Sequence, residues 1–147
     1  MAAALRILHW ACRVTLAIVF LWSGIIKVRS PLEFAGALSG YKLFPDTLIY
    51  PLATYFPWFE IALGVLFLIG WKIRYVAIGG TALLLAFTVL LTVTYLRGID
   101  ANCGCFGFGD RISPRTIARD ALILLPALLL VFEARLKKLA AADTPVI

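Results

Sequence analysis

The chain has 147 residues, of which 63% are hydrophobic and only 15% are charged, and its mean hydropathy is +0.97. These values exclude an ordinary soluble domain, and the length leaves room for one domain covering residues 1–147. The formal net charge of +6 is spread over the termini and the ends of short connecting segments. Because no basic stripe with interleaved aromatic residues occurs, we exclude nucleic-acid binding and expect a lipid bilayer as the surrounding partner.

Four continuous apolar runs are each near the roughly 20 residues that a transmembrane helix needs. Their hydrophobicity is continuous and not alternating, which predicts helices and excludes barrel strands. No small-x-small cleavage site follows the first run before Lys27, so we expect that run to be retained as a helix. The sequence predicts an all-α fold, a four-helix transmembrane bundle, with spans at about residues 5–26, 47–71, 75–96 and 117–132, the last extending as far as 136.

The segment between the first two spans is predicted to form a short helix at the membrane interface. Ser30 followed by Pro31 is the pattern of an N-cap and a proline at the first helical position. Apolar residues then recur on one face over residues 32–41, as in an amphipathic helix lying on a membrane. We expect Gly40 to end this helix.

The second span contains two prolines, Pro51 and Pro57. A helix starting only at Pro57 would be about 22 Å long by Trp71, at about 1.5 Å per residue, and too short to cross upright. The span must therefore begin near residue 46 or 47, with Asp46 as the N-cap and kinks at the prolines. This start places Glu60 well inside the membrane.

Two ionisable residues are predicted to meet inside the bundle. Arg13 and Glu60 lie at matched depths, about 12 Å and about 20 Å from opposite surfaces of a membrane about 30 Å thick. The simplest interpretation is an ion pair that fixes the packing of the first two spans. A role in proton movement or quinone binding stays equally open, because charges inside a membrane are costly to keep.

A glycine-rich polar loop between the third and fourth spans contains Cys103 and Cys105, two of the three cysteines. Glycines beside and between the thiols permit the sharp turn that a Cys-x-Cys disulfide needs, and strained exposed disulfides exchange readily. We expect this loop to be exposed, and the pair is therefore the candidate catalytic site. A structural disulfide or free thiols remain alternatives. We predict no metal site, because His9 is the only histidine and lies near the opposite surface.

Charged residues are expected to cluster near the membrane surface on the side of the cysteines. They are Lys27, Arg97, Arg119 and Asp120. A cation beside a thiol lowers its pKa and raises the reactive thiolate fraction. Ordinary anchoring at the interface explains these residues about as well.

A resemblance to a known family rests on several of these motifs. The run Arg97-Gly98-Ile99-Asp100, then Cys103-Gly104-Cys105-Phe106-Gly107, and Arg119-Asp120 before the last apolar run resemble the MauE branch of the DoxX-like redox-associated membrane proteins. The front half agrees in residues 24–27 and in Pro57-Trp58-Phe59-Glu60. The resemblance implies a membrane protein of thiol–disulfide traffic that works beside a thioredoxin-like protein, helping disulfides to form in an extracytoplasmic client such as methylamine dehydrogenase. Related DoxX-like proteins imply a quinone as a further candidate cofactor.

Two function classes follow. The first is a thiol–disulfide redox protein acting through Cys103 and Cys105, an oxidoreductase component whose status as an enzyme stays open. The second is a non-catalytic scaffold subunit of a maturation or quinone-linked complex, in which the disulfide merely holds the loop.

Topology is predicted from charge and chemistry together. Lysine and arginine are almost equally numerous on the two sides, but the side carrying both termini has the shorter link between spans. A functional disulfide belongs in an oxidising compartment. We therefore expect a multi-pass protein of the bacterial inner membrane, with cytoplasmic termini and the cysteine loop in the periplasm.

Overall fold

The computed structural model describes the backbone of residues 2–107 and 109–142, and the side chains of residues 4–107 and 109–133. The described chain is all-helical, and its only β-type pairing is an isolated bridge between Asn102 and Arg111. The helices are α1 (Ala2–Arg29), α2 (Pro31–Gly40), α3 (Asp46–Ile69), α4 (Ile73–Leu96) and α5 (Pro114–Ala142).

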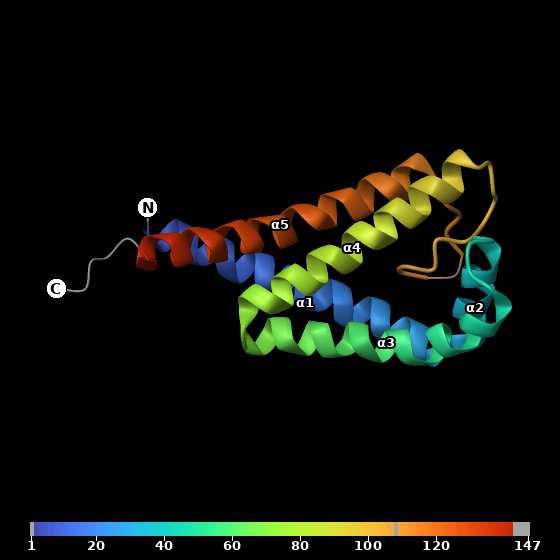
Figure 1. Ribbon diagram of the computed structural model, residues 1–147, viewed down its shortest axis with the longest axis horizontal. Helices are drawn as coiled ribbons and strands as arrows, with labels where there is room; N and C mark the ends of the chain where they lie inside the picture. The colour runs from blue at the N-terminus through green and yellow to red at the C-terminus, as the bar shows by residue number, and fades with distance from the viewer. Residues whose placement is uncertain (1, 108, 143–147) are drawn as a thin grey trace.

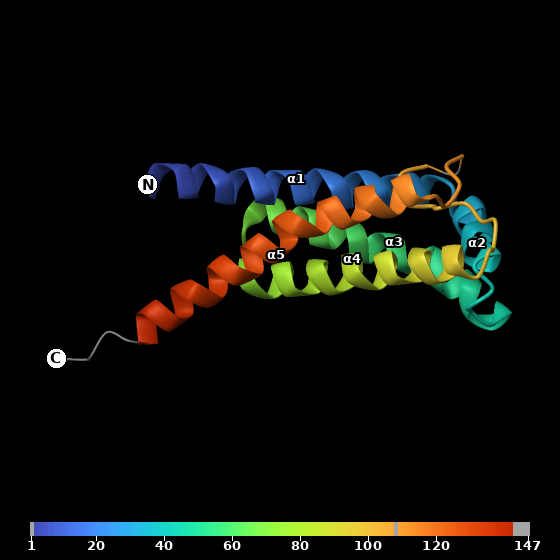
Figure 2. The same cartoon turned by 90° about the horizontal axis from the view of Figure 1, so that it is seen from above.

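The four long helices form an elongated bundle whose two ends differ (Figure 1). The first residues of α1 and the last turns of α5 lie at one end, where α3 also turns into α4. The short helix α2 and the loop between α4 and α5 lie at the other end. Figure 2 shows that α5 runs obliquely to α1, and Figure 1 shows α4 rising away from α3 toward the end that carries α2 and the cysteine loop. The loop with the cysteines is thus remote from both termini.

Three helices, α1, α3 and α4, are long and apolar enough to cross a membrane. The fourth predicted span is not confirmed. Helix α5 has 29 residues, but its uncharged stretch between Asp120 and Glu133 covers only about 18 Å at about 1.5 Å per residue. The number of spans therefore depends on whether the charged ends of α5 enter the bilayer.

The outside of the bundle is apolar, unlike the surface of a soluble protein. Large apolar side chains such as Ile7, Tyr55 and Tyr75 are about 70% exposed on the outside of the bundle, whereas Lys27 and Glu60 are buried inside it. Exposed apolar surface on this scale requires an apolar surrounding. This distribution supports a membrane environment.

The predicted start of the second span is confirmed, with Pro51 and Pro57 both inside α3. Asp46 is the first helical residue, whereas Pro45 occupies the N-cap position expected for Asp46. The predicted short helix after the first span is also confirmed, since α2 follows Ser30, starts at Pro31 and ends at Gly40, whereas its place at a membrane interface stays a prediction. The buried face of α2 packs on the cysteine loop.

Two glycines bring α1 and α3 together. A Cβ atom on Gly24 would lie 2.9 Å from the carbonyl oxygen of Pro57, and one on Gly64 would lie 2.7 Å from Cγ of Leu21. Small residues let helices in a membrane approach closely and gain packing energy. These contacts set the register of the two antiparallel helices, and this register decides which polar groups inside the bundle can meet.

Candidate functional site

The cysteine loop folds back against the end of the bundle. The Cys103 amide donates to the Asp110 carbonyl at 2.7 Å, and the Ile112 amide donates to the Ala101 carbonyl at 3.0 Å. The buried Tyr41 hydroxyl donates to the Cys103 carbonyl. Burial raises the pKa of Tyr41 above its ordinary value, so this hydroxyl keeps the proton that it donates. The loop backbone is therefore held from both sides.

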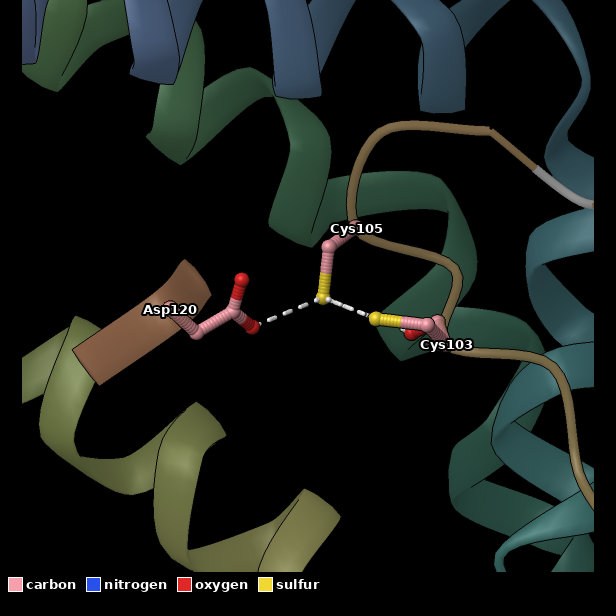
Figure 3. Close-up of side chains that lie close together, drawn as sticks. All are labelled: Cys103, Cys105 and Asp120. Carbon is pink, nitrogen blue, oxygen red and sulfur yellow. Dashed lines mark hydrogen bonds between the residues drawn. The ribbon is translucent and has the colours of Figure 1, made fainter. Parts of the chain in front are cut away.

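Gly104 allows the two cysteine side chains to face each other. Its φ of +67° is in the left-handed region, which glycine adopts without steric cost. A Cβ atom there would also approach the Ala37 side chain to 3.2 Å. The two sulfurs consequently lie 3.0 Å apart, within hydrogen-bonding distance (Figure 3).

The expectation that the cysteines lie on an exposed loop is wrong. Cys103 is 1% exposed and Cys105 is 6% exposed, because the loop packs beneath α2 instead of projecting from the bundle. Both cysteines are free thiols in this structure. A reversible disulfide between them stays a prediction.

Two adjacent residues of α5 place opposite charges on the two sulfurs. Arg119 Nη2 lies 3.6 Å from Cys103 Sγ, and Asp120 Oδ2 lies 3.5 Å from Cys105 Sγ. Arg119 Nε also donates to Asp120 Oδ1 at 3.2 Å. The Ser113–Thr116 side chains cap the start of α5 reciprocally and so fix this part of the helix. Of the four charged residues expected near the thiols, these two make direct contact.

The two thiols differ in acidity. The hydrogen bond between the two thiols lowers the pKa of Cys103 below the ordinary thiol value, and the Arg119 guanidinium acts in the same direction against burial and Asp120. The pKa of Cys105 is raised well above the ordinary value by the hydrogen bond to Cys103 and by burial. Cys103 is therefore the better nucleophile of the pair.

The other two predicted cations have different roles. Arg97 follows the last residue of α4 and is exposed. Lys27 is 1% exposed and its Nζ contacts both carboxylate oxygens of Glu60, at 2.7 and 2.8 Å, and Ser23 Oγ at 2.8 Å. Three phenylalanine rings surround the ammonium group at 5.0–5.7 Å. This buried pair is the ionic centre of the bundle.

The predicted pairing of Arg13 with Glu60 is wrong. Arg13 donates from Nε to the Phe67 carbonyl at 3.1 Å and from Nη2 to the Leu68 carbonyl at 3.0 Å. These carbonyls belong to the last turn of α3, where backbone acceptors have no partner within the helix. Helix α1 continues to Arg29, and its register against α3 brings Lys27, not Arg13, level with Glu60. The prediction counted the depth of each residue from an assumed membrane surface, and this count does not give the register of α1 against α3.

A small cavity of about 30 Å³ lies between the thiol pair and the buried ion pair. Its lining includes Lys27, Glu60, Cys105 and Asp120. It has room for a water molecule but not for a ring system. A larger cavity of about 230 Å³ beside Phe34 and Phe87 is lined entirely by apolar side chains. It offers no hydrogen-bond partner to a quinone carbonyl, so the quinone prediction gains no support from it.

A third potential metal ligand lies beside the thiols. One oxygen of Asp120 and the sulfurs of Cys103 and Cys105 all lie within 4.8 Å of one another, and all three residues are buried. In the sequence, Asp120 belongs to the helix after the loop, and its spacing from the cysteines is not one that metal-binding motifs use. The sequence pattern therefore did not indicate this cluster. The close approach of α5 to the loop creates the cluster.

Comparison with known proteins identifies the family. A family model described as methylamine utilisation protein MauE matches residues 5–133. The chain belongs to the MauE family. The chain is 30% identical over 122 residues to methylamine utilization protein MauE of Paracoccus denitrificans, covering 81% of this chain and 66% of that one. It is 33% identical over 125 residues to MauE of Paracoccus versutus, covering 83% and 67%.

These matches confirm the predicted resemblance to MauE, while none of their descriptions names the DoxX-like group. This MauE-family chain spans about two thirds of the length of the two relatives. No solved structure is significantly similar to it. Family membership and the three long apolar helices together indicate a membrane protein.

Proposed function

We propose that this MauE-family chain is a membrane component of thiol–disulfide exchange that assists disulfide formation in an extracytoplasmic client, within methylamine utilisation or a related maturation system. The observation that carries the proposal is the pair of sulfurs 3.0 Å apart, with Arg119 beside Cys103 and Asp120 beside Cys105. A structural disulfide would need neither charge. The similarity to methylamine utilization proteins supports placing this role within methylamine utilisation.

The charges suggest that the two cysteines have different roles in the exchange. The Cys103 thiolate attacks a disulfide of an oxidised partner, forms a mixed disulfide and releases the partner's other sulfur as a thiolate. Cys105 loses its proton to Asp120 and attacks Cys103, which closes the Cys103–Cys105 disulfide and frees the reduced partner. A client dithiol then reduces this disulfide by the reverse steps and leaves oxidised. Two electrons thus pass from client to partner.

A partner must supply the second redox centre. Cys12 is the only other cysteine of the chain and is buried in the separate core cluster near the termini. A protein with one active pair turns over only when a second molecule resets it. A thioredoxin-like protein, whose own dithiol can enter a mixed disulfide, fits this requirement. Because both thiols are buried, the partner must displace part of the loop to reach Cys103.

The proposal includes a topology. We place four spans in the bacterial inner membrane, with α5 crossing beside α4, both termini in the cytoplasm and the cysteine loop in the periplasm. Arg119 and Asp120 satisfy each other at the start of α5 and so reduce the cost of their depth. An oxidising compartment on the loop side would keep the pair oxidised between turnovers.

Trapping tests the proposal. Cys105→Ser removes the resolving thiol, so a mixed disulfide formed through Cys103 should accumulate and appear as a reducible higher-mass species on a non-reducing gel. Cys12→Ser is the matched control and should trap nothing. A thioredoxin-like protein or a secreted client should be identified in the trapped species by mass spectrometry. Absence of any species that depends on Cys103 would contradict the exchange role.

The second candidate function is a non-catalytic scaffold. It is favoured by the near-complete burial of both thiols and by the hydrogen bonds that hold the loop. A scaffold would keep its client complex intact when both cysteines are replaced by serine. Exchange activity would be lost in the same variant.

A further inference from the structure

We propose that the reduced pair Cys103 and Cys105 forms, together with Asp120, a binding site for one zinc(II) ion. The three ligand atoms come from two elements, the loop and α5, and lie within 4.8 Å of one another (Figure 3). All three residues are buried, which separates this cluster from the exposed acidic groups common on protein surfaces. The inference goes beyond the exchange role and does not depend on it.

The distances are close to those of a tetrahedral site. With Zn–S bonds of about 2.3 Å and Zn–O bonds of about 2.0–2.2 Å, tetrahedral angles separate two sulfurs by about 3.8 Å and a sulfur from an oxygen by about 3.5 Å. The distance between Cys105 Sγ and Asp120 Oδ2 is already 3.5 Å. The two sulfurs, at 3.0 Å, need to separate by less than 1 Å, which side-chain rotation at Cys103 can supply.

The local charge favours a divalent ion. Two thiolates and one carboxylate carry three negative charges, and Arg119 beside them carries one positive charge. One zinc(II) ion makes the buried group neutral. A mixed sulfur and oxygen ligand set suits zinc, whereas copper(I) prefers sulfur alone and magnesium prefers oxygen alone. Binding is not a redox step. Zinc(II) displaces the two thiol protons, which are released to solvent, and no oxidation state changes.

A water molecule can occupy the fourth coordination position. The cavity of about 30 Å³ is lined by Cys105 and Asp120, and it is large enough for one water molecule. Three protein ligands and one water are typical of zinc sites with an open position. The Tyr41 hydrogen bond and the left-handed Gly104 hold the loop backbone in place before an ion arrives, with Cys105 at the wall of this cavity.

Zinc and the disulfide exclude each other, since the same two sulfurs cannot be bonded together and both serve as thiolate ligands. The bound ion would hold the pair reduced and protect it from air oxidation. Zinc thus regulates when the pair can form a disulfide.

Zinc titration of the purified full chain in detergent tests the site. Reduced, chelator-treated protein should bind one zinc ion per chain in competition with a chromophoric chelator, and oxidised protein should bind none there. Cobalt(II) should give the intense thiolate-to-metal charge-transfer absorption of a sulfur-ligated site. Zinc should also slow the oxidation of the pair at least tenfold.

Asp120→Asn should weaken zinc binding by about tenfold or more, in the range found when a metal site loses part of its coordination. Asp110→Asn is the matched control, because Asp110 also faces Arg119, at 3.7 Å, but is no ligand. Cys12→Ser should leave binding unchanged. Zinc affinity equal in Asp120→Asn and Asp110→Asn, or no cobalt–thiolate absorption in the reduced native chain, would overturn the site. Trapping through Cys103 is read separately, so loss of zinc binding with trapping intact refutes only the zinc site.

Discussion

Single charged residues add to the difference that the mutual hydrogen bond and burial create between the two cysteines. Arg119 and Asp120 are neighbours in sequence, yet one contacts Cys103 and the other contacts Cys105. Successive helical residues point about 100° apart, so a helix end facing the loop can present one charge to each sulfur. Farther inside, Lys27 and Glu60 neutralise each other by direct contact. At both sites, removing one charged residue would leave the charge of its partner uncompensated and would lower the stability of the fold.

The Lys27–Glu60 pair should be strongly coupled. Lys27→Met leaves Glu60 buried and unpaired, and we expect a loss of about 3–5 kcal/mol in the free energy of unfolding. The double variant Lys27→Met/Glu60→Gln should recover much of this loss, because neither charge remains. Reversible unfolding in mixed detergent micelles measures both values.

The exposed pair of Arg111 and Asp100 is the matched control for this cycle, since its side chains are 76% and 67% exposed. Arg111→Gln should change stability by less than about 1 kcal/mol. Arg13→Gln and Glu60→Gln should be additive within about 0.5 kcal/mol, as expected for residues without a shared partner. Strong coupling between Arg13 and Glu60 would contradict the observed pairing.

Among the elements, the contact between α1 and α3 positions the ionic centre. Gly24 and Gly64 allow backbone-level contact, and this contact brings Lys27 level with Glu60. At one end of the same interface, Arg13 closes the last turn of α3 by hydrogen bonds to its carbonyls. A shift of one helical turn, about 5.4 Å, would separate both sets of partners.

Gly24→Ala should therefore disturb the interface. Its added Cβ would lie 2.7 Å from Ile61 Cγ1 and 2.9 Å from the Pro57 carbonyl oxygen, which belongs to backbone and cannot rotate away. We expect a loss of about 1–3 kcal/mol, as for overpacked cores, measured as a lower thermal midpoint in detergent. Gly36→Ala, where nothing lies within 4 Å, should be neutral or stabilising by up to about 1 kcal/mol. Equal effects of the two substitutions would argue against close packing at Gly24.

At the scale of the whole molecule, the cysteine loop lies at one end of the bundle, and the start of α1 and the end of α5 lie at the other. The first core cluster contains Cys12 and joins α1, α3, α4 and α5, whereas the second contains Cys103 and Cys105 and joins α2, α3, α4 and the loop. The ends of α1 and α5 that carry the termini lie opposite to α2 (Figure 1). If the bundle spans a bilayer along its long axis, the thiols and the termini are on different sides.

Cysteine labelling tests this orientation. In a background with Cys12, Cys103 and Cys105 replaced by serine, Asp100→Cys should react in intact cells with a membrane-impermeant maleimide. Trp71→Cys, on the exposed turn between α3 and α4, should react only after lysis. Both positions are exposed, so a difference reports the side of the membrane and not burial. The reverse pattern would invert the proposed topology.

The sequence by itself determined the local elements. Continuous hydrophobicity predicted α1, α3 and α4, the pair Ser30-Pro31 marked the start of α2, and the length argument put the start of α3 near residue 46 or 47 in spite of its prolines. It also singled out Cys103 and Cys105, and family resemblance supplied MauE. These features depend on neighbours within a few turns, so a linear pattern contains them.

Only the tertiary structure decided which distant groups meet. Counting residues from an assumed membrane surface paired Glu60 with Arg13, whereas close packing at Gly24 and Gly64 pairs it with Lys27. The loop looked exposed because it is polar and rich in glycine, yet α2 covers it and buries both thiols. Asp120 reaches Cys105 because the start of α5 packs against the folded loop. Such contacts depend on helix register and side-chain packing, which hydrophobic periodicity does not specify.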